Sequence, residues 1–211
     1  HDGKTGPQHG FARTSEWTLA HAAMVGEDVH LTFTLGPNEA SRSLGFDHFQ
    51  LAYRVTVGRR LSLELGVVND SGAGGARGGG AAAATAATDA ANGGAALVFE
   101  EALHTYYAVA DATKVSIEGL GGTEYIDKVD GLKRKRQEEK VLRFAGRTDR
   151  PYLNTTATCV LRDEAGGRKI VIAKTGSRST VVWNPWKEFT ATMVDMEPDG
   201  WLHMTAIETA N

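Results

Sequence analysis

The chain has 211 residues, of which 41% are hydrophobic and 23% are charged, and its formal net charge is −3. This composition is typical of a soluble globular protein of one domain, here residues 1–211, and its slight acidic excess gives no reason to expect nucleic acid or a membrane as a partner. The single cysteine, Cys159, excludes an internal disulfide, so a reducing cytoplasm is the expected compartment.

A turn-like motif with a histidine and an arginine stands near the start of the chain, at residues 7–13. Loops at the edge of a sheet are common places for binding residues. The guanidinium of Arg13 offers a planar fork of donors that suits phosphate oxygens. Most arginines of a chain are simply exposed, however, so this motif alone leaves the role of Arg13 and of the nearby His9 open.

Alternation of polar and apolar residues predicts strands along most of the chain. For example, Leu61, Leu63 and Leu65 fall on one face of a strand, and we expect that face to lie in the core. Many short strands separated by short loops favour an all-β fold, built as a large antiparallel β-sandwich. The clearest predicted strands are residues 29–35, 49–57, 61–69, 97–109, 169–174 and 201–208.

Residues 71–94 interrupt this pattern, because they are almost entirely Gly, Ala and Thr. Such a segment has little apolar area to offset the entropy of ordering the backbone, about 1 to 2 kcal/mol per residue. We therefore expect a flexible insertion between two strands, without a chemical role.

His104 lies in the predicted strand 97–109, where alternation places it on the same face as Ala102 and Tyr106. An imidazole can donate and retake a proton near neutral pH, and the two neighbours could leave room for a ligand and line its site. A lone histidine in a strand is more often structural or exposed, so spacing alone favours that second interpretation.

The basic run at residues 133–140 carries two acidic residues and no aromatic residue. A nucleic-acid surface normally combines a basic patch with a recognisable binding motif or with aromatic side chains. We therefore expect a solvated loop here.

Three residues of the C-terminal half have side chains suited to binding or proton transfer. Asp149 could accept hydrogen bonds from ligand hydroxyls or could be a turn residue. Trp183 could offer a flat apolar face to a ligand or could pack in the core. Glu208 projects from the apolar side of a strand, next to Met204 and Ala206, and is equally well interpreted as a general base or as one half of a structural ion pair.

Six motifs follow one another along the chain: PQHGFAR (7–13), FEEALHTYY (99–107), YIDK (125–128), TDRPYLNT (148–155), TVVWNPW (180–186) and IETAN (207–211). Together and in this order they resemble the aldose 1-epimerase superfamily, and more narrowly its glucose-6-phosphate 1-epimerase branch. The resemblance extends over nearly the whole chain apart from the Gly/Ala-rich segment.

The resemblance implies a sandwich of the galactose mutarotase type with further strands before and after the present ends, so the chain is expected to be truncated on both sides. It implies that the protein interconverts the α and β anomers of a hexose 6-phosphate, with glucose 6-phosphate the expected sugar. His104 and Glu208 resemble the catalytic pair. The expected substrate contacts are His9, Arg13 and Asp149, to which we add Trp183.

Anomer exchange requires that a base removes the C1 hydroxyl proton while an acid protonates the ring oxygen. Two proton carriers suffice for this chemistry, so we expect no cofactor and no metal. The expected partner is a small phosphorylated hexose, bound by a monomer. Two alternatives stay open, namely a mutarotase for an unphosphorylated aldose and a non-catalytic carbohydrate-binding module on the same fold.

Overall fold

The structure is a computed structural model that describes residues 6–71 and 95–211. The chain groups into two compact units, His1–Val98 and Phe99–Asn211, and each is described by itself. The prediction of one domain over residues 1–211 stays a prediction. Of the predicted Gly/Ala-rich insertion, residues 72–94 lie outside the described residues. Among the residues described, no helix is long and apolar enough to cross a membrane.

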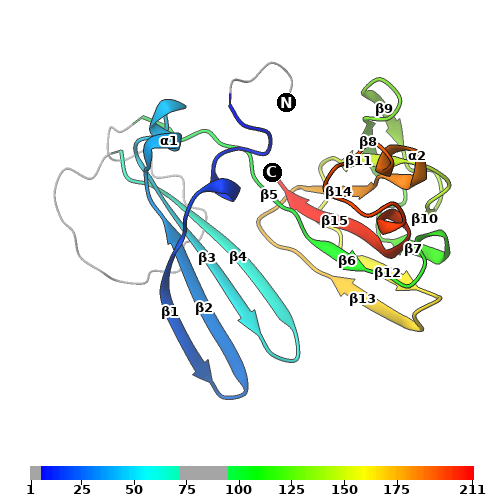
Figure 1. Ribbon diagram of the computed structural model, residues 1–211, viewed down its shortest axis with the longest axis horizontal. Helices are drawn as coiled ribbons and strands as arrows, with labels where there is room; N and C mark the ends of the chain where they lie inside the picture. Colours follow the sequence, from blue (N-terminus) through cyan, green and yellow to red (C-terminus); the bar gives the residue numbers. More distant parts are fainter. Residues whose placement is uncertain (1–5, 72–94) are drawn as a thin grey trace. The chain divides into compact units, whose positions relative to one another are not determined.

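The described part of the first unit contains one antiparallel sheet with the strand order β1-β2-β3-β4 (Figure 1). Its described elements are η1 (Ala12–Thr14), β1 (Thr18–Val25), β2 (Asp28–Leu35), α1 (Glu39–Ser43), β3 (Phe49–Val57) and β4 (Leu61–Asn69). Strands β2, β3 and β4 confirm the strands predicted at residues 29–35, 49–57 and 61–69.

Local interactions explain how the connection between β2 and β3 folds. The Asn38 side chain accepts a hydrogen bond from the Ser41 amide, and the Ser41 hydroxyl accepts one from the Asn38 amide, which forms a capping box at the start of α1. The Phe11 ring packs against the rings of Phe46 and Phe49, with centroids 5.8 and 5.6 Å away. This aromatic cluster therefore joins the N-terminal segment to the beginning of β3.

The prediction that Leu61 lies in a core is wrong, because 61% of its surface is exposed. Leu61 pairs with Val57 beside the turn that joins β3 to β4, and Val57 is also exposed. Leu63 and Leu65, farther from this turn, are half-buried. The alternation thus correctly predicts the strand and overestimates the burial of the residue at its end.

The second unit contains two antiparallel sheets (Figure 1). The large sheet has the order β5-β15-β14-β11-β8-β9, with β6 also paired to β15, and the small sheet has the order β10-β7-β12-β13. The strands of the large sheet are β5 (Ala102–Leu103), β6 (Tyr106–Ala108), β8 (Glu124–Asp127), β9 (Lys133–Arg136), β11 (Thr148–Tyr152), β14 (Ser179–Asn184) and β15 (Met204–Ala210). Those of the small sheet are β7 (Val115–Glu118), β10 (Val141–Arg143), β12 (Cys159–Asp163) and β13 (Arg168–Ile172), the last at the strand predicted for residues 169–174.

Side chains from both sheets of the second unit meet in one core, which confirms the predicted antiparallel β-sandwich. The large sheet contributes Tyr125, Tyr152, Val182 and Ile207, and the small sheet contributes Ile117, Leu142 and Leu161. Complete burial of one such aliphatic side chain stabilises the fold by about 1.5 to 3 kcal/mol. Three short helices complete the unit: η3 (Ala112–Lys114), α2 (Trp186–Thr190) and η4 (Gly200–His203).

The single strand predicted at residues 97–109 is wrong in its extent, because only β5 and β6 form there. Between them, the Thr105 amide donates to the Leu103 carbonyl at 2.8 Å, which is a local turn contact rather than a ladder bond. The register with β15 is nevertheless the same on both sides of this interruption. The two strands therefore act as one interrupted strand with His104 at the break.

The strand predicted at residues 201–208 begins later than expected, because its first residues form η4. The Asn184 side-chain amide donates to the Trp201 carbonyl at 2.8 Å, and the Trp201 ring packs on the Trp186 ring with centroids 4.6 Å apart. These contacts with the end of β14 and the start of α2 favour the helical turn over an extended strand.

The solvated loop predicted at residues 133–140 is wrong for its first half, which forms the edge strand β9. Arg134 pairs with Glu124 of β8 at 2.6 Å, and Lys135 pairs with Asp127 at 2.8 Å and Asp130 at 2.7 Å. The acidic residues that allow this strand to form lie on the preceding strand and turn. A view of the basic run alone therefore misses them.

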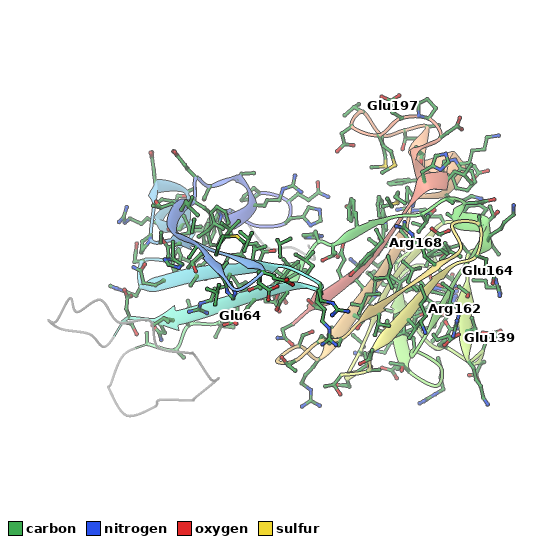
Figure 2. All side chains as sticks on the ribbon, turned by 90° about the horizontal axis from the view of Figure 1, so that it is seen from below. Glu64, Glu139, Arg162, Glu164, Arg168 and Glu197 are labelled. Atoms are coloured by element: carbon green, nitrogen blue, oxygen red, sulfur yellow. The ribbon has the colours of Figure 1, made fainter. Side chains whose placement is uncertain are left out.

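The outer face of the small sheet carries exposed ion pairs. Arg162 of β12 contacts Glu118 of β7 at 2.5 Å, and Arg143 of β10 contacts Glu164 at 2.9 Å. Figure 2 shows Arg162 and Glu164 on this part of the second unit. The first pair joins two neighbouring strands, and the second joins β10 to the turn after β12. Exposed ion pairs of this kind contribute little to stability.

Candidate active site

The outer face of the large sheet carries four of the six predicted site residues. Tyr152, Val182 and Ile207 of β11, β14 and β15 point into the core. Successive strand residues alternate between the two faces of a sheet. A residue one or three positions along the same strand from one of these core residues therefore points outward. The residues on this outer face include His104, Asp149, Trp183 and Glu208.

His104 and Glu208 form a direct contact on this face. The unchanged register of β5 and β6 places His104 opposite Glu208, and the distance from His104 Nδ1 to Glu208 Oε1 is 3.0 Å. Only 7% of the Glu208 side chain is exposed, compared with 36% of the His104 side chain. A buried carboxylate requires a hydrogen-bonding partner, and the imidazole supplies it.

An aromatic pair lies in the adjacent row of the same face. Trp183 of β14 and Tyr106 of β6 both stand opposite Ala206 of β15. Because the alanine side chain is small, the two rings stack above it, with centroids 5.7 Å apart and planes 26° apart. Trp183 therefore packs outside the core of the sandwich, and Tyr106 is 56% exposed.

Asp149 extends this row on the other side of Trp183, which it faces across the β11–β14 pairing. The Lys128 amide donates to the Asp149 carbonyl at 3.0 Å, which places Lys128 opposite Asp149. The Lys128 Nζ atom lies 3.9 Å from Asp149 Oδ1. Burial raises the pKa of the Asp149 carboxyl above its ordinary value, while the positive charges of Lys128 and Arg147 act in the opposite direction.

Sequence reasoning missed the two cations near Asp149. Lys128 belongs to the motif at residues 125–128, and Arg147 lies two positions before Asp149, so both positions could have been noticed. Neither spacing shows that the two side chains converge on one carboxylate, because their closeness depends on the pairing of β8 with β11 and on the loop before β11.

The other two predicted residues, His9 and Arg13, belong to the first unit. His9 and Gly10 have φ angles of +64° and +75°, and the Gly10 amide donates to the Pro7 carbonyl at 3.0 Å. A positive φ is uncommon outside glycine, although histidine adopts it more often than most residues. Arg13 lies in η1, and its side chain is exposed. The turn-like motif predicted for this segment is thus confirmed.

Two surface hollows elsewhere in the described structure are less suited to be the active site. They have volumes of about 500 and 490 Å³ and are lined by residues such as Ser15 and Asn38 in the first unit and Gly121 and Lys140 in the second. Neither hollow is lined by any of the predicted site residues. Within residues 6–71 and 95–211, no group of three or more His, Cys, Asp and Glu side chains is arranged to hold a metal ion.

Comparison with known proteins identifies similar chains and folds. The family model described as aldose 1-epimerase matches residues 83–211. Proteins of Escherichia coli (strain K12) and Salmonella typhimurium, both named as candidate glucose-6-phosphate 1-epimerases, are each 32% identical to this chain. The alignments cover 97% and 96% of this chain, and 60% of each relative. The chain therefore spans about 60% of the length of these curated relatives.

Solved structures support the same relationship. The crystal structure of a candidate mutarotase from Salmonella typhimurium is 30% identical with a TM-score of 0.80, covering 97% of this chain and 60% of that one. A galactose mutarotase related enzyme from Lactobacillus acidophilus is 12% identical with a TM-score of 0.65, covering 97% and 62%, and this likeness shows the fold alone. From the family match and the identity to these relatives, we conclude that the chain belongs to the aldose 1-epimerase family.

Proposed function

We propose that this protein interconverts the α and β anomers of a hexose 6-phosphate by opening and reclosing the sugar ring, without a cofactor. The observation that carries the proposal is the 3.0 Å contact between His104 Nδ1 and Glu208 Oε1 on the outer face of the large sheet. Membership of the aldose 1-epimerase family and the names of the two bacterial relatives support this activity and this substrate.

The contact supplies one acid and one base in the same place. When Glu208 is ionised and His104 is protonated, Nδ1–H donates to Oε1 and the imidazolium keeps a second proton on Nε2. The carboxylate can then take the proton of the C1 hydroxyl, while Nε2–H gives its proton to the ring oxygen. The bond between C1 and the ring oxygen breaks as the C1 carbonyl forms.

Ring closure reverses these steps on the other face of the carbonyl. Rotation about the bond between C1 and C2 presents the opposite face of the aldehyde to the C5 hydroxyl, His104 takes the hydroxyl proton and Glu208 returns a proton to the new C1 hydroxyl. The protein ends in its starting state, so no redox partner is consumed. Asp149 is suited to accept a hydrogen bond from a sugar hydroxyl, and the Trp183–Tyr106 stack offers an apolar face to its C–H groups.

Magnetisation-transfer NMR on glucose 6-phosphate tests the catalytic pair directly, with the spontaneous exchange rate subtracted. We expect His104→Ala and Glu208→Gln each to lower the exchange rate by about 10²- to 10⁴-fold, the usual range for general acid–base groups. The controls His203→Ala and Glu164→Gln change the same residue types elsewhere in the unit and should keep the wild-type rate. Equal exchange in all four variants would reject the assignment.

The phosphate requirement needs a separate test, because an unphosphorylated aldose mutarotase would use the same acid and base. A charge-assisted hydrogen bond is worth about 1.5 to 3 kcal/mol, so Arg13→Ala should raise the KM for glucose 6-phosphate by about 10- to 150-fold if Arg13 binds the phosphate. The control is Arg143→Ala, an exposed arginine paired with Glu164. If Arg13→Ala leaves this KM unchanged and wild type turns over glucose equally well, the unphosphorylated aldose is favoured.

A non-catalytic carbohydrate-binding module would give a different pattern. It would bind sugar in a calorimetric titration, and wild type would not accelerate anomer exchange above the spontaneous rate. The proposal also includes a small phosphorylated hexose as the partner, bound by a cytoplasmic monomer. Size-exclusion chromatography with light scattering measures the oligomeric state, and cell fractionation measures the compartment.

A further inference from the structure

Two cations from different segments converge on Asp149. Lys128 follows β8 and contacts Asp149 twice, through its amide to the Asp149 carbonyl at 3.0 Å and through Nζ, which lies 3.9 Å from Oδ1. Only 19% of the Asp149 side chain is exposed, compared with 47% of the Lys128 side chain. The carboxylate is therefore withdrawn from solvent while its cationic neighbour stays hydrated.

Arg147 approaches from the loop before β11 and is held by an aromatic ring. Its guanidinium carbon lies 3.6 Å from the centroid of the Phe189 ring of α2. A guanidinium over an aromatic face gains a cation–π attraction and loses much of its freedom. The charge of Arg147 is thus fixed near enough to Asp149 to act on the carboxyl.

The other charges that act on the Asp149 carboxyl are negative. Glu208 of β15 and Asp127 of β8 both disfavour a further negative charge at this position, and Trp183 of β14 contributes none. Burial acts in the same direction as these carboxylates. Lys128 and Arg147 are therefore the two cations that offset burial and these negative charges at Asp149.

We propose that Lys128 and Arg147 are positioning residues that keep the Asp149 carboxylate ionised and in place beside Trp183, so that it accepts a hydrogen bond from the ligand. An ionised carboxylate only accepts hydrogen bonds, whereas a protonated one also donates, so the charge state decides which ligand hydroxyls it suits. The sugar as ligand rests on the proposed function. The ionisation of Asp149 is a property of the protein itself and can be measured without a substrate.

Carbon-13 NMR titration of the aspartate side-chain carboxyls tests the proposal, with the Asp149 signal assigned from its loss in Asp149→Asn. A unit charge at about 4 Å in a largely hydrated setting changes a pKa by about 0.5 to 1 pH unit. We therefore expect the pKa of Asp149 to rise by about that amount in Lys128→Met, and to rise in the same direction in Arg147→Gln. Lys128→Arg and Arg147→Lys keep the charge and should restore the wild-type value. Arg143→Gln, on the small sheet, should leave it unchanged.

The pH dependence of KM provides a second measurement. It would be the same in wild type and in the variants if Lys128 and Arg147 had a purely structural role. In Lys128→Met and Arg147→Gln, the rise of KM toward acid pH should begin at a higher pH by the same amount, while kcat stays within twofold. An Asp149 pKa that is identical in both variants and wild type would overturn the proposal. If wild type shows no anomer exchange, the proposed function fails, and the carboxyl titration still decides the inference.

Discussion

The two outer faces of the sandwich in the second unit use the same residue types in different surroundings. On the small sheet, Glu118 is exposed, and its hydrogen bond with Arg162 lowers the pKa of its carboxyl below the ordinary value. On the large sheet, burial raises the pKa of Asp149 despite two nearby cations, and Glu208 is almost fully buried against His104. The first face carries ion pairs in water, and the second holds carboxylates away from it.

This difference indicates at which face the loss of carboxylate hydration disfavours the folded state. An exposed ion pair is screened by solvent and contributes little to stability. A half-buried carboxylate loses hydration, which disfavours the folded state unless its partners compensate. Such carboxylates are expected mainly where their charge is used in binding or proton transfer. The outer face of the large sheet is therefore the functional face in our proposal.

The largest expected effect is on activity, from replacing one carboxylate on each face. Glu208→Gln should slow the exchange of glucose 6-phosphate anomers by about 10²- to 10⁴-fold, because the amide cannot take the C1 hydroxyl proton. Glu118→Gln should stay within twofold of wild type. Comparable losses of exchange rate in Glu208→Gln and Glu118→Gln would contradict the proposed difference in function between the two outer faces.

The inner faces of the two sheets should behave alike, in contrast to the outer faces. Ile207 of the large sheet and Leu161 of the small sheet are buried in the same core. Replacing either residue with alanine should lower the free energy of unfolding by about 2 to 5 kcal/mol, measured by urea denaturation. A loss in only one of the two variants would contradict the shared core.

Asp149→Asn should make the protein more stable at pH 7, although it should weaken sugar binding. The folded-state pKa of Asp149 lies above the ordinary value of 3.8, so the folded protein binds more protons between these two values. The free energy of unfolding of wild type therefore falls as pH rises through this window. Asparagine does not titrate, so the variant does not lose this stability. Melting temperatures at pH 3 and pH 7 measure the gain, which should be present only at the higher pH.

Glu118→Gln should have the smallest effect, with the opposite sign. The folded-state pKa of Glu118 lies below the ordinary value of 4.5, so its ionised form stabilises the folded protein above that pH. This contribution disappears as pH falls through the lowered pKa. The melting temperature of Glu118→Gln should be slightly below that of wild type at pH 7. Under strongly acidic conditions the two melting temperatures should be equal. Melting curves of both proteins under the two conditions measure this difference.

Alternation correctly predicted β2, β3 and β4, and it placed His104 on the same face as Ala102 and Tyr106. It failed at short or interrupted elements, such as β10 with three residues and the break between β5 and β6. The three residues of β10 are too few to show a period, and the break between β5 and β6 follows a local turn contact at Thr105, which polar and apolar alternation does not contain. The resemblance to the family selected the site residues, and their catalytic and binding roles stay predictions.

By itself, the sequence determined that the longer segments β2, β3 and β4 are extended, that the sheets are antiparallel and which side chains share a face with their near neighbours. These properties follow from the two-residue period of a strand and from the short connections between strands. Only the tertiary structure decided that His104 meets Glu208, 104 positions away, and that Lys128 stands opposite Asp149. Such contacts depend on which strands pair and in what register, and burial of the whole core selects that pairing.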